Sequence, residues 1–179
     1  MPQLTADGYV VWFTGLPGSG KTTIAKVVQT ALAKGGRKVE LLDGDEVRTW
    51  LSPNEGFSRE DRERHLKRVA HVCQLLARNG IVVLASFVSP YRSTREYARK
   101  TVGTFVEVYV KCSLETCRLR DPKGLYRKAS EGKIGNMTGM QDPYEEPPAP
   151  EVVVETESQT PEESARVVLA RLAALGHLR

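Results

Sequence analysis

The segment that most constrains this chain spans residues 15–22 and reads GLPGSGKT. It satisfies the pattern G-x-x-x-x-G-K-[ST] at every specified position. Glycines let the backbone turn its N–H groups inward around a phosphate chain, and a helix that follows directly presents its positive N-terminal end to the same anion. In this pattern Lys21 reaches the β- and γ-phosphates, and the Thr22 hydroxyl is a ligand for Mg²⁺. The segment therefore predicts a phosphate loop that binds a nucleoside triphosphate.

The residues on either side supply the context that such a loop requires. Residues 9–13 form a short apolar run typical of a strand, and residues 23–28 show a helical pattern. The alternative is a glycine-rich turn followed by a chance Lys-Thr pair, and it explains neither neighbour. We therefore assign nucleotide binding to the residues of the loop, namely Gly15, Pro17, Gly18, Ser19, Gly20, Lys21, Thr22 and Thr23.

Strand-like and helix-like segments alternate along the rest of the chain. Apolar runs typical of strands cover residues 9–13, 39–42, 81–87, 105–110 and 152–154. Helical patterns cover residues 21–34, 59–79 and 161–175. This alternation predicts an α/β fold: a doubly wound, mainly parallel five-stranded sheet with helices on both faces. Ligands of such folds bind at the carboxyl ends of the strands.

Length and composition narrow the class of protein. The 179 residues, 40% of them hydrophobic, suit one domain over residues 1–179. The net charge of +4 comes from basic residues interspersed with acidic ones, which favours an anionic small molecule over nucleic acid as the partner. Three cysteines without a C-x-x-C pair indicate neither a disulfide framework nor a zinc site. No run reaches membrane-spanning length and residues 1–8 lack signal-peptide features, so we expect a cytoplasmic protein without membrane contact.

The alternation breaks after residue 124. Residues 125–150 are expected to be irregular, because the region is rich in glycines and prolines, at positions 124, 132, 135, 139 and 122, 143, 147, 148, 150. Long irregular segments of compact domains are usually functional or mobile. In a phosphate-transfer enzyme this segment, about residues 121–150, would be a mobile lid that excludes water. A floppy surface loop is the alternative.

Two carboxylates and an arginine follow the second predicted strand. Asp45 could hold Mg²⁺ through water or accept a proton from an attacking hydroxyl, and Arg48 could bind an anionic group. A plain helix N-cap is the alternative role for Asp45.

The start of the second predicted helix, residues 59–79, carries further candidates. Ser58 and Asp61 are spaced as a capping box, and the position that would complete a hydrophobic staple with Phe57 is Arg62. Phe57 is therefore free to stack on a flat ligand. Arg62 and His65 lie three residues apart on one helix face, where a solvated polar face is the alternative.

Hydroxyl and basic side chains gather after two later segments. Val88, Ser89 and Arg92 follow the third predicted strand, where the substrate of such a fold binds. Arg120 and Lys123 stand where the predicted lid begins. Basic residues at this place commonly close over phosphates, and an arginine plane can cover an adenine ring.

Taken together these residues resemble the adenylyl-sulfate kinase (APS kinase) family over nearly the whole chain. The segments that carry the resemblance are residues 13–23, 42–45, 56–62, 87–92, 120–126 and 142–145. Members use ATP to phosphorylate the ribose 3′-hydroxyl of adenosine 5′-phosphosulfate in sulfate assimilation. The resemblance implies a P-loop kinase fold, a homodimer, and association or fusion with ATP sulfurylase in some relatives.

The family's functional positions carry over to named residues of this chain. The resemblance implies acceptor contacts from side chains and backbone at Asp45, Arg48, Phe57, Arg62, His65, Val88, Ser89, Lys123, Leu125, Asn136 and Met137. It places Arg120 and Thr156 beside the ATP base, and gives ATP and Mg²⁺ as cofactors with Thr22 and Asp45 at the metal.

Two departures from the family pattern stand out. The family commonly has Glu-Asn where this chain has Arg64-His65, and Phe where it has Met137. His65 can still hydrogen-bond a ribose or base. Met137 loses ring stacking worth roughly 1 kcal/mol, so we expect weaker acceptor binding than in relatives with both aromatics.

The residues predict the chemistry as follows. Lys21 and Mg²⁺ neutralise charge on the transferring group, and Asp45 orients or deprotonates the 3′-hydroxyl. The family's serine at Ser89 is traditionally labelled a phosphoserine intermediate, but no histidine or lysine neighbours it in sequence, which favours direct transfer with Ser89 orienting the acceptor. Another small-molecule kinase, of the gluconate or nucleoside-monophosphate type, and a catalytically silent nucleotide-binding module remain the alternatives.

Overall fold

A computed structural model describes residues 8–178 and centres on a five-stranded sheet with the strand order β2-β3-β1-β4-β5. All neighbouring strands run parallel. The strands are β1 Val10–Thr14, β2 Val39–Asp43, β3 Val82–Ser86, β4 Phe105–Lys111 and β5 Val152–Glu155. The predicted doubly wound parallel sheet is therefore confirmed.

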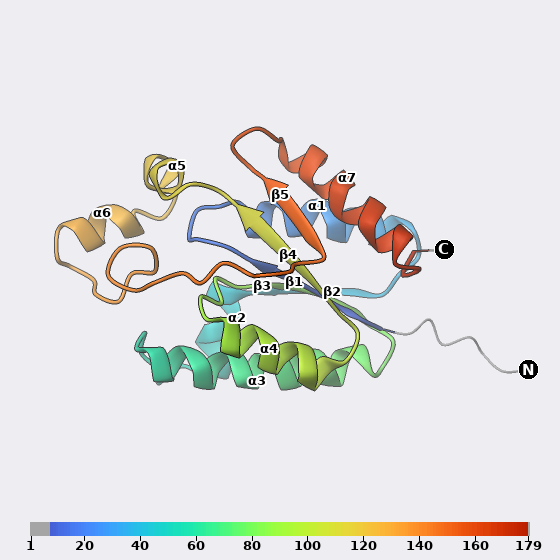
Figure 1. The fold of residues 1–179 in the computed structure, drawn as a ribbon. Helices are drawn as coiled ribbons and strands as arrows, with labels where there is room; N and C mark the ends of the chain where they lie inside the picture. Colours follow the sequence, from blue (N-terminus) through green and yellow to red (C-terminus); the bar gives the residue numbers. More distant parts are fainter. Residues whose placement is uncertain (1–7, 179) are drawn as a thin grey trace, which may run out of the picture.

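Helices cover both faces of the sheet (Figure 1). One face packs against α1 (Lys21–Lys34) and α7 (Pro161–Ala174), with Ile24, Val28 and Leu172 in the core between them. The second core lies under three further helices, α2 Gly44–Leu51, α3 Arg59–Ala77 and α4 Arg92–Val102. The two layers fit the continuous apolar runs of β1 and β3, whose residues are all buried.

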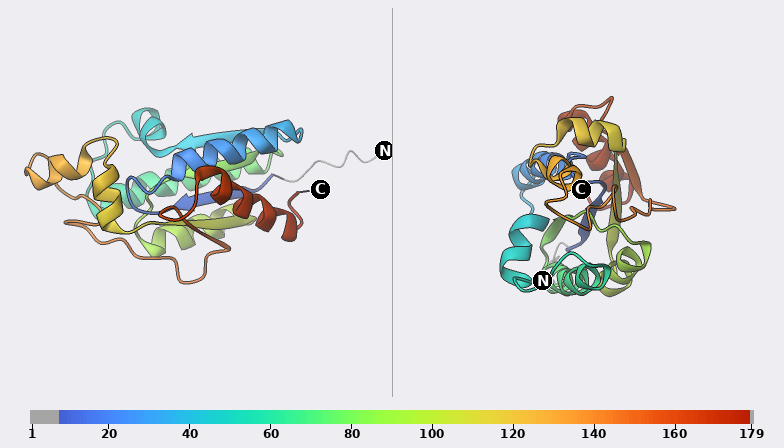
Figure 2. Two further views of the ribbon diagram at one scale, coloured as in Figure 1. Left: turned by 90° about the horizontal axis from the view of Figure 1, so that it is seen from above. Right: turned by 90° about the vertical axis from the view of Figure 1, so that its left-hand side faces the viewer.

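Two short helices lie beyond the carboxyl ends of the strands, α5 (Leu114–Arg120) and α6 (Leu125–Ser130). Figure 2 shows that the loop after α6 stays at this end of the molecule before the chain returns to β5. The sequence predicted irregular structure from residue 125 onward, and that prediction was wrong for the first six residues. Tyr126 and Ala129 bury one side of α6, so local packing stabilises a helix that the surrounding glycines and prolines concealed.

Local signals define where the long helices begin. The Ser58 side chain accepts a hydrogen bond from the Asp61 N–H, and the Asp61 carboxylate accepts one from the Ser58 N–H, which completes the predicted capping box of α3. Thr160 and Glu163 make the same exchange at the start of α7. Because this box fixes the first turn of α3, it also fixes the loop that carries Phe57.

Strand register brings polar residues together at the carboxyl ends. Asp43, the last residue of β2, pairs in register with Ser86 at the end of β3. Ser86 in turn lies opposite Phe13, next to the start of the phosphate loop. The ends of β2, β3 and β1 therefore form one edge on which a site can be assembled.

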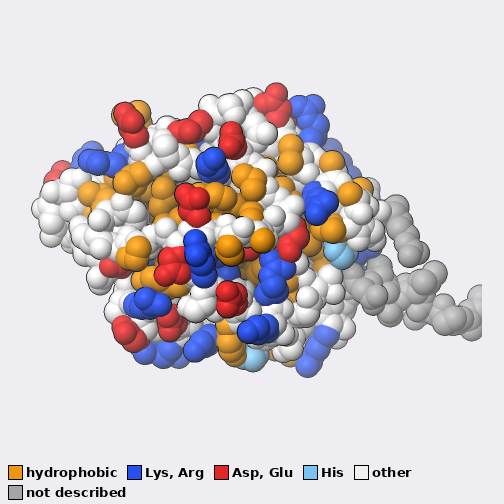
Figure 3. Space-filling view, in the orientation of Figure 1, with side chains coloured by type: hydrophobic (Ala, Val, Ile, Leu, Met, Phe, Trp, Pro, Cys, Tyr) orange, Lys and Arg blue, Asp and Glu red, His pale blue; other side chains and the backbone are white. Residues whose placement is uncertain are grey.

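The surface mixes charges of both signs. In Figure 3, Lys and Arg side chains lie among Asp and Glu side chains over the face shown. Within residues 8–178, no helix combines the length and the apolar character needed to cross a bilayer. The expectation about a signal peptide concerns residues 1–7 almost entirely, and these lie outside the described residues.

Candidate active site at the carboxyl ends of the strands

A cavity of about 1040 Å³ opens at the carboxyl ends of the strands. Its walls come from the phosphate loop, the start of α2, the end of β3 with the loop that follows it, and the segment around α6. Most of the residues predicted from the sequence line it: Pro17, Gly18, Gly20, Lys21, Thr22, Thr23, Asp45, Phe57, Arg62, Val88, Arg120, Lys123, Leu125, Asn136, Met137 and Thr156. The predicted residues outside this lining are Gly15, Ser19, Arg48, His65 and Ser89.

The phosphate loop requires glycine at Gly15 and Gly20. A Cβ atom at Gly15 would lie 2.5 Å from the Val110 carbonyl oxygen, so the loop could not approach β4 as it does. Gly20 has a φ of 99° and directly precedes α1, a left-handed conformation that side chains disfavour. Gly15 and Ser19 thus shape the loop without lining the cavity, whereas the N-terminus of α1 faces the cavity.

Lys21 is 8% exposed, and its ammonium group is held at the loop. Its Nζ donates hydrogen bonds to the carbonyl oxygens of Gly15, at 3.0 Å, and Leu16, at 2.8 Å. Burial lowers the pKa of Lys21 to about 8. A phosphate that replaced the two carbonyls would supply negative charge and favour the protonated lysine.

Thr22 joins the phosphate loop to the ends of β2 and β3. Its hydroxyl donates to the Asp43 carboxylate at 2.6 Å and lies 3.0 Å from the Ser86 hydroxyl oxygen. Asp43 is also the N-cap of α2, accepting from the Asp45 N–H. The alternative reading of Asp45 as the N-cap was therefore wrong. The sequence analysis assigned Asp45 to the metal and did not assign Asp43 or Ser86. The pairing of β2 with β3 is what places these two residues beside Thr22.

Arg120 and Thr156, which the resemblance places at the ATP base, contact each other beside the phosphate loop. Arg120 donates to the Thr156 hydroxyl at 3.0 Å and to the Thr156 carbonyl at 2.5 Å. The Thr156 hydroxyl donates onward to the Ser19 carbonyl at 2.8 Å. This chain of hydrogen bonds links the ends of α5 and β5 to the loop at the wall of the cavity.

Phe57 is an exposed aromatic ring at the cavity wall, with 54% of its surface accessible. The guanidinium carbons of Arg48 and Arg62 lie 4.5 and 5.5 Å from its ring centroid. Arg48 also donates to the carbonyls of Glu55 and Gly56, so it holds the loop of Phe57 from outside the cavity. Partial burial lowers the pKa of both arginines. The ring therefore has the exposure that stacking on a ligand requires.

Two contacts cross the cavity mouth to the predicted lid. Lys123 forms an ion pair with Asp45, and the Arg62 guanidinium donates to the Asn136 carbonyl at 2.6 Å. Asn136 adopts a left-handed φ of 56°. All four residues were predicted to contact the acceptor, and in this structure they contact one another. Polar groups on both sides of the mouth are thus within reach of the same ligand.

His65 does not reach the cavity. It is 3% exposed, packs near the ring of Phe87, and its Nδ1 lies 2.8 Å from the Ser52 hydroxyl oxygen. Burial, together with the positive charges of Arg48 and Arg68, lowers the pKa of His65 to about 4. The alternative of a solvated polar face is therefore wrong for His65, because its imidazole is buried between α3 and the sheet.

Val88 lines the cavity, whereas the Ser89 side chain turns inward. Ser89 is 2% exposed; its hydroxyl accepts from Trp12 Nε1 and donates to the Thr14 hydroxyl, both at 3.0 Å. Its φ of 41° lies in the left-handed region. The resemblance implies that the backbone around Val88 and Ser89 faces the acceptor; the Ser89 hydroxyl itself faces the centre of the sheet.

The predicted lid has its own small core. Met137 and Tyr126 pack with Cys112, Cys117 and Ala129, and the Tyr126 hydroxyl donates to the Pro17 carbonyl at 2.8 Å. Met137 is 6% exposed and also lines the cavity. The segment therefore packs directly on the phosphate loop.

Comparison with known proteins gives consistent matches. A family model described as adenylylsulphate kinase matches residues 7–155. A probable adenylyl-sulfate kinase from Aeropyrum pernix is 52% identical over 172 residues, covering 94% of this chain and 94% of its own. A probable bifunctional SAT/APS kinase from Sorangium cellulosum is 47% identical over 172 residues, covering 96% of this chain and 30% of its own. The Mycobacterium tuberculosis APS kinase CysC, solved in complex with AMPPNP and APS, has a TM-score of 0.90 at 40% identity, with 93% and 98% of the two chains covered.

Proposed function

This chain belongs to the adenylylsulphate kinase family, and we propose that it transfers the γ-phosphoryl group of ATP to the ribose 3′-hydroxyl of adenosine 5′-phosphosulfate. The products are ADP and 3′-phosphoadenosine 5′-phosphosulfate. The observation that carries the proposal is a single cavity that contains both a phosphate loop, with Lys21 and Thr22, and the acceptor residues Phe57, Arg62 and Lys123. Its volume of about 1040 Å³ lies at the upper end of the range of about 300–1,000 Å³ that is typical of ligand pockets.

The phosphate loop and α1 bind the donor. Lys21 exchanges its bonds to the Gly15 and Leu16 carbonyls for bonds to the β- and γ-phosphates. The buried position of Lys21 strengthens its attraction to the phosphates, because little water competes there. Arg120 and Thr156 border the ATP base.

Thr22, Asp43 and Ser86 would hold Mg²⁺. The side-chain oxygens of Asp43 and Ser86 both lie within hydrogen-bonding distance of the Thr22 hydroxyl. Oxygen ligands of this kind are the ones that Mg²⁺ prefers. No group of three or more His, Cys, Asp or Glu side chains in residues 8–178 is arranged to hold a metal. That agrees with an ion that takes few protein ligands and relies on phosphate oxygens and water. When bound, the ion neutralises charge on the transferring phosphoryl group.

The acceptor adenine stacks on Phe57, whose exposed ring is already oriented by Arg48 and Arg62. Lys123 and Arg62 bind the anionic groups of the acceptor. Asp45 exchanges its ion pair with Lys123 for a hydrogen bond to the 3′-hydroxyl and orients or deprotonates it. Val88 contacts the acceptor from the wall, and Leu125, Asn136 and Met137 contact it from the lid.

Transfer is direct from ATP to the 3′-hydroxyl, without a phosphoserine. The Ser89 hydroxyl is buried, and it is already engaged by Trp12, Thr14 and the Phe87 carbonyl. A nucleophile needs an adjacent base and access to the phosphate. Ser89 instead supports the loop that positions the acceptor.

Residues 121–150 act as a lid. The Lys123–Asp45 and Arg62–Asn136 contacts close the cavity mouth, and each joins the lid to the acceptor side. Ligand entry exchanges these contacts for contacts to the acceptor. Closure then excludes water, which would otherwise compete with the 3′-hydroxyl.

We also propose a cytoplasmic homodimer. All three cysteines are free and buried, which suits a reducing compartment. The Sorangium cellulosum relative is a probable bifunctional SAT/APS kinase. We therefore propose association with ATP sulfurylase, which co-purification tests.

The test is to incubate the protein with Mg-ATP and, separately, adenosine 5′-phosphosulfate, AMP or gluconate. ADP release is followed and the phosphorylated product is identified. The expected result is rapid ADP release with adenosine 5′-phosphosulfate and with neither AMP nor gluconate, together with a 3′-phosphorylated product. Turnover with another acceptor would favour a different small-molecule kinase. ATP binding without turnover on any acceptor would favour a silent module.

A further inference from the structure

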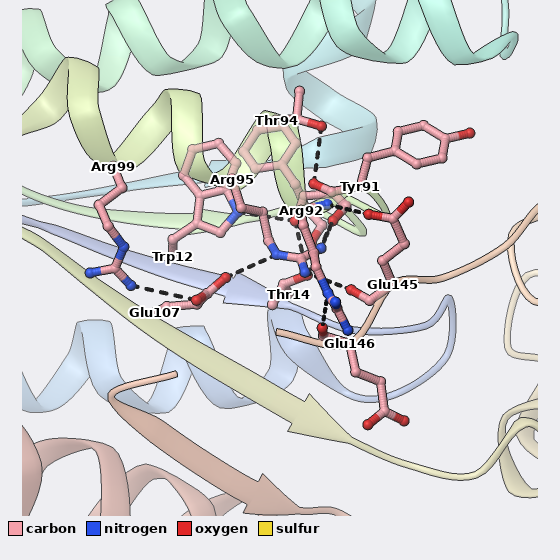
Figure 4. Close-up of polar contacts among 12 residues, drawn as sticks. Trp12, Thr14, Tyr91, Arg92, Thr94, Arg95, Arg99, Glu107, Glu145 and Glu146 are labelled. Carbon is pink, nitrogen blue, oxygen red and sulfur yellow. Dashed lines mark hydrogen bonds and ion pairs between the residues drawn. The ribbon is translucent and has the colours of Figure 1, made fainter. Parts of the chain in front are cut away.

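Arg95 is a buried arginine of α4 whose guanidinium donates in three directions. It is 3% exposed. Its Nε donates to the Glu107 carboxylate at 2.9 Å, its Nη1 to the Ser89 carbonyl at 2.5 Å, and its Nη2 to the Glu145 carbonyl at 2.5 Å. Figure 4 shows this guanidinium between Glu107 of β4 and the segment that carries Glu145. One side chain thus joins three separate parts of the chain.

Fold stability alone does not account for this arrangement. A buried ion pair such as Arg95–Glu107 loses the hydration of both charges, and apolar residues of similar size often stabilise a core equally well. The planar fork of arginine does supply several N–H groups in fixed directions. What Arg95 provides beyond stability is therefore a set position for the two carbonyls that it binds.

The first carbonyl belongs to the loop that borders the acceptor part of the cavity. Ser89 holds a left-handed φ of 41°, which is strained for a residue other than glycine. The residue before it, Val88, lines the cavity, and its carbonyl accepts from the Thr14 hydroxyl at 2.9 Å. Arg95 and Thr14 thus hold this loop through consecutive carbonyls, and they fix which backbone atoms of Val88 face the cavity.

The second carbonyl belongs to Glu145, in the C-terminal part of the lid. Glu145 donates its N–H to the Pro90 carbonyl at 2.8 Å, and its carboxylate accepts from the Arg92 N–H at 2.7 Å. The neighbouring Tyr144 hydroxyl lies 2.9 Å from the Thr14 hydroxyl. The C-terminal end of the lid is therefore attached to the same loop that Arg95 holds.

We propose that Arg95 is a positioning residue that sets the acceptor-side loop and the C-terminal anchor of the lid together. This inference rests on the proposed function, because the loop matters through the acceptor that it faces. Loss of the fork lets Val88 and the lid anchor shift independently. Acceptor binding then weakens, while the phosphate loop, which Arg95 does not contact, retains its affinity for ATP.

The experiment compares three variants of the full chain. Arg95→Lys keeps the positive charge beside Glu107 but removes the fork. Arg95→Gln/Glu107→Gln removes both charges, so a folded protein is obtained even if the single substitution leaves Glu107 unpaired. Arg99→Gln is the matched control, since Arg99 lies one turn further along α4 and binds Glu107 and Glu151 without contacting Ser89 or Glu145. KM values for both substrates and tryptic cleavage at the exposed Lys128 and Lys133 of the lid are measured.

For both Arg95 variants we expect the KM for adenosine 5′-phosphosulfate to rise about tenfold, because misplacement of a binding loop is costly. The KM for ATP should change by less than about twofold, because Arg95 does not contact the phosphate loop. A general loss of structure would instead raise both KM values. The lid should be cleaved faster than in the control. Equal changes in the two KM values, or results matching Arg99→Gln, would overturn the inference. Failure of the wild-type protein to use the phosphosulfate would instead refute the proposed function, and the cleavage comparison would still test the anchoring of the lid.

Discussion

The Thr22 hydroxyl donates a 2.6 Å hydrogen bond to the Asp43 carboxylate, which connects the first turn of α1 to the end of β2. Ser86 completes the group from β3, at 3.0 Å from Thr22. Asp45, two residues further, turns away to pair with Lys123. Two neighbouring carboxylates therefore face different partners, which fits the separate metal and acceptor roles that we propose for Asp43 and Asp45.

Asp43→Asn should lower kcat on the order of 10²-fold, because it removes a charge beside the transferring phosphates. It should also raise the Mg²⁺ concentration needed for half-maximal rate. Asparagine is a good N-cap, so α2 and the fold should be retained. Initial rates over a magnesium titration, with thermal unfolding as a check, provide the measurement.

Asp45→Asn is the matched comparison. It should lower kcat because the 3′-hydroxyl is no longer oriented or deprotonated by a carboxylate. The magnesium concentration needed for half-maximal rate should stay unchanged. If Asp45→Asn instead raised the magnesium requirement and Asp43→Asn did not, the metal assignment would pass back to Asp45.

Ser89→Ala should reduce turnover about tenfold without abolishing it, since the hydroxyl positions a loop. The Trp12 N–H would lose its buried partner, which destabilises the fold by roughly 1–3 kcal/mol. Steady-state rates and denaturant unfolding measure the two effects. Complete loss of turnover in a folded variant, with loss of a trapped phosphoenzyme, would establish the covalent route.

Phe57→Leu should raise the KM for the acceptor about fivefold, equivalent to roughly 1 kcal/mol of lost stacking. The KM for ATP and the free energy of unfolding should stay the same, because the ring is 54% exposed. Trp50→Leu is the control: Trp50 is equally exposed, on α2, and does not line the cavity. Equal effects of the two substitutions would show that Phe57 does not stack on the acceptor.

Met137→Phe should tighten acceptor binding by a similar factor, about fivefold, if the ring gains the stacking that the thioether lacks. Isothermal titration with the acceptor and a non-hydrolysable ATP analogue measures it. The larger ring must fit the lid core around Cys117 and Tyr126, so unfolding is monitored in parallel. An unchanged affinity in a stably folded variant would contradict the expectation.

Stability should fall in acid because of His65. Its pKa is lowered from 6.5 to about 4, so the folded state disfavours the proton that the unfolded state accepts. The stabilising contribution is complete above pH 6.5 and declines toward pH 4. Between pH 6.5 and pH 5 the loss is on the order of 1–2 kcal/mol.

His65→Asn isolates this effect, because asparagine does not titrate. Urea unfolding of both proteins at pH 7, 6 and 5 is compared. The difference in their free energies of unfolding should change with pH in this range, whereas the carboxylates contribute equally to both. Parallel curves would show that His65 does not titrate between these pH values.

The sequence predicted the sheet well, because continuous apolar runs between turn residues are a strong local signal. Each strand was placed within two residues, and α1, α3 and α7 were identified from their caps. The helix α6 was missed because its stabilising contacts, Tyr126 to Pro17 and to Cys117, come from distant parts of the chain.

Site residues could be predicted where a sequence motif specifies them. They could not be predicted where strand register or packing determines their position. Lys21 and Thr22 followed from the loop pattern, whereas Asp43 and Ser86 depend on the pairing of β2 with β3. His65 resembled a polar surface residue until the packing of α3 buried it. Sequence analysis did not single out Arg95, since nothing local indicates its partner Glu107 on β4.

The central place of β1 has a consequence for how the chain folds. Residues 10–14 lie between β3 and β4, so both partners exist only once the chain extends to residue 111. Pairings so far apart in sequence form slowly, because the loop between them must close first. Until then a nascent chain carries an apolar segment, YVVWF, with unpaired backbone groups, which favours aggregation. We expect its folding yield to depend on chaperones that cover residues 9–14 during synthesis.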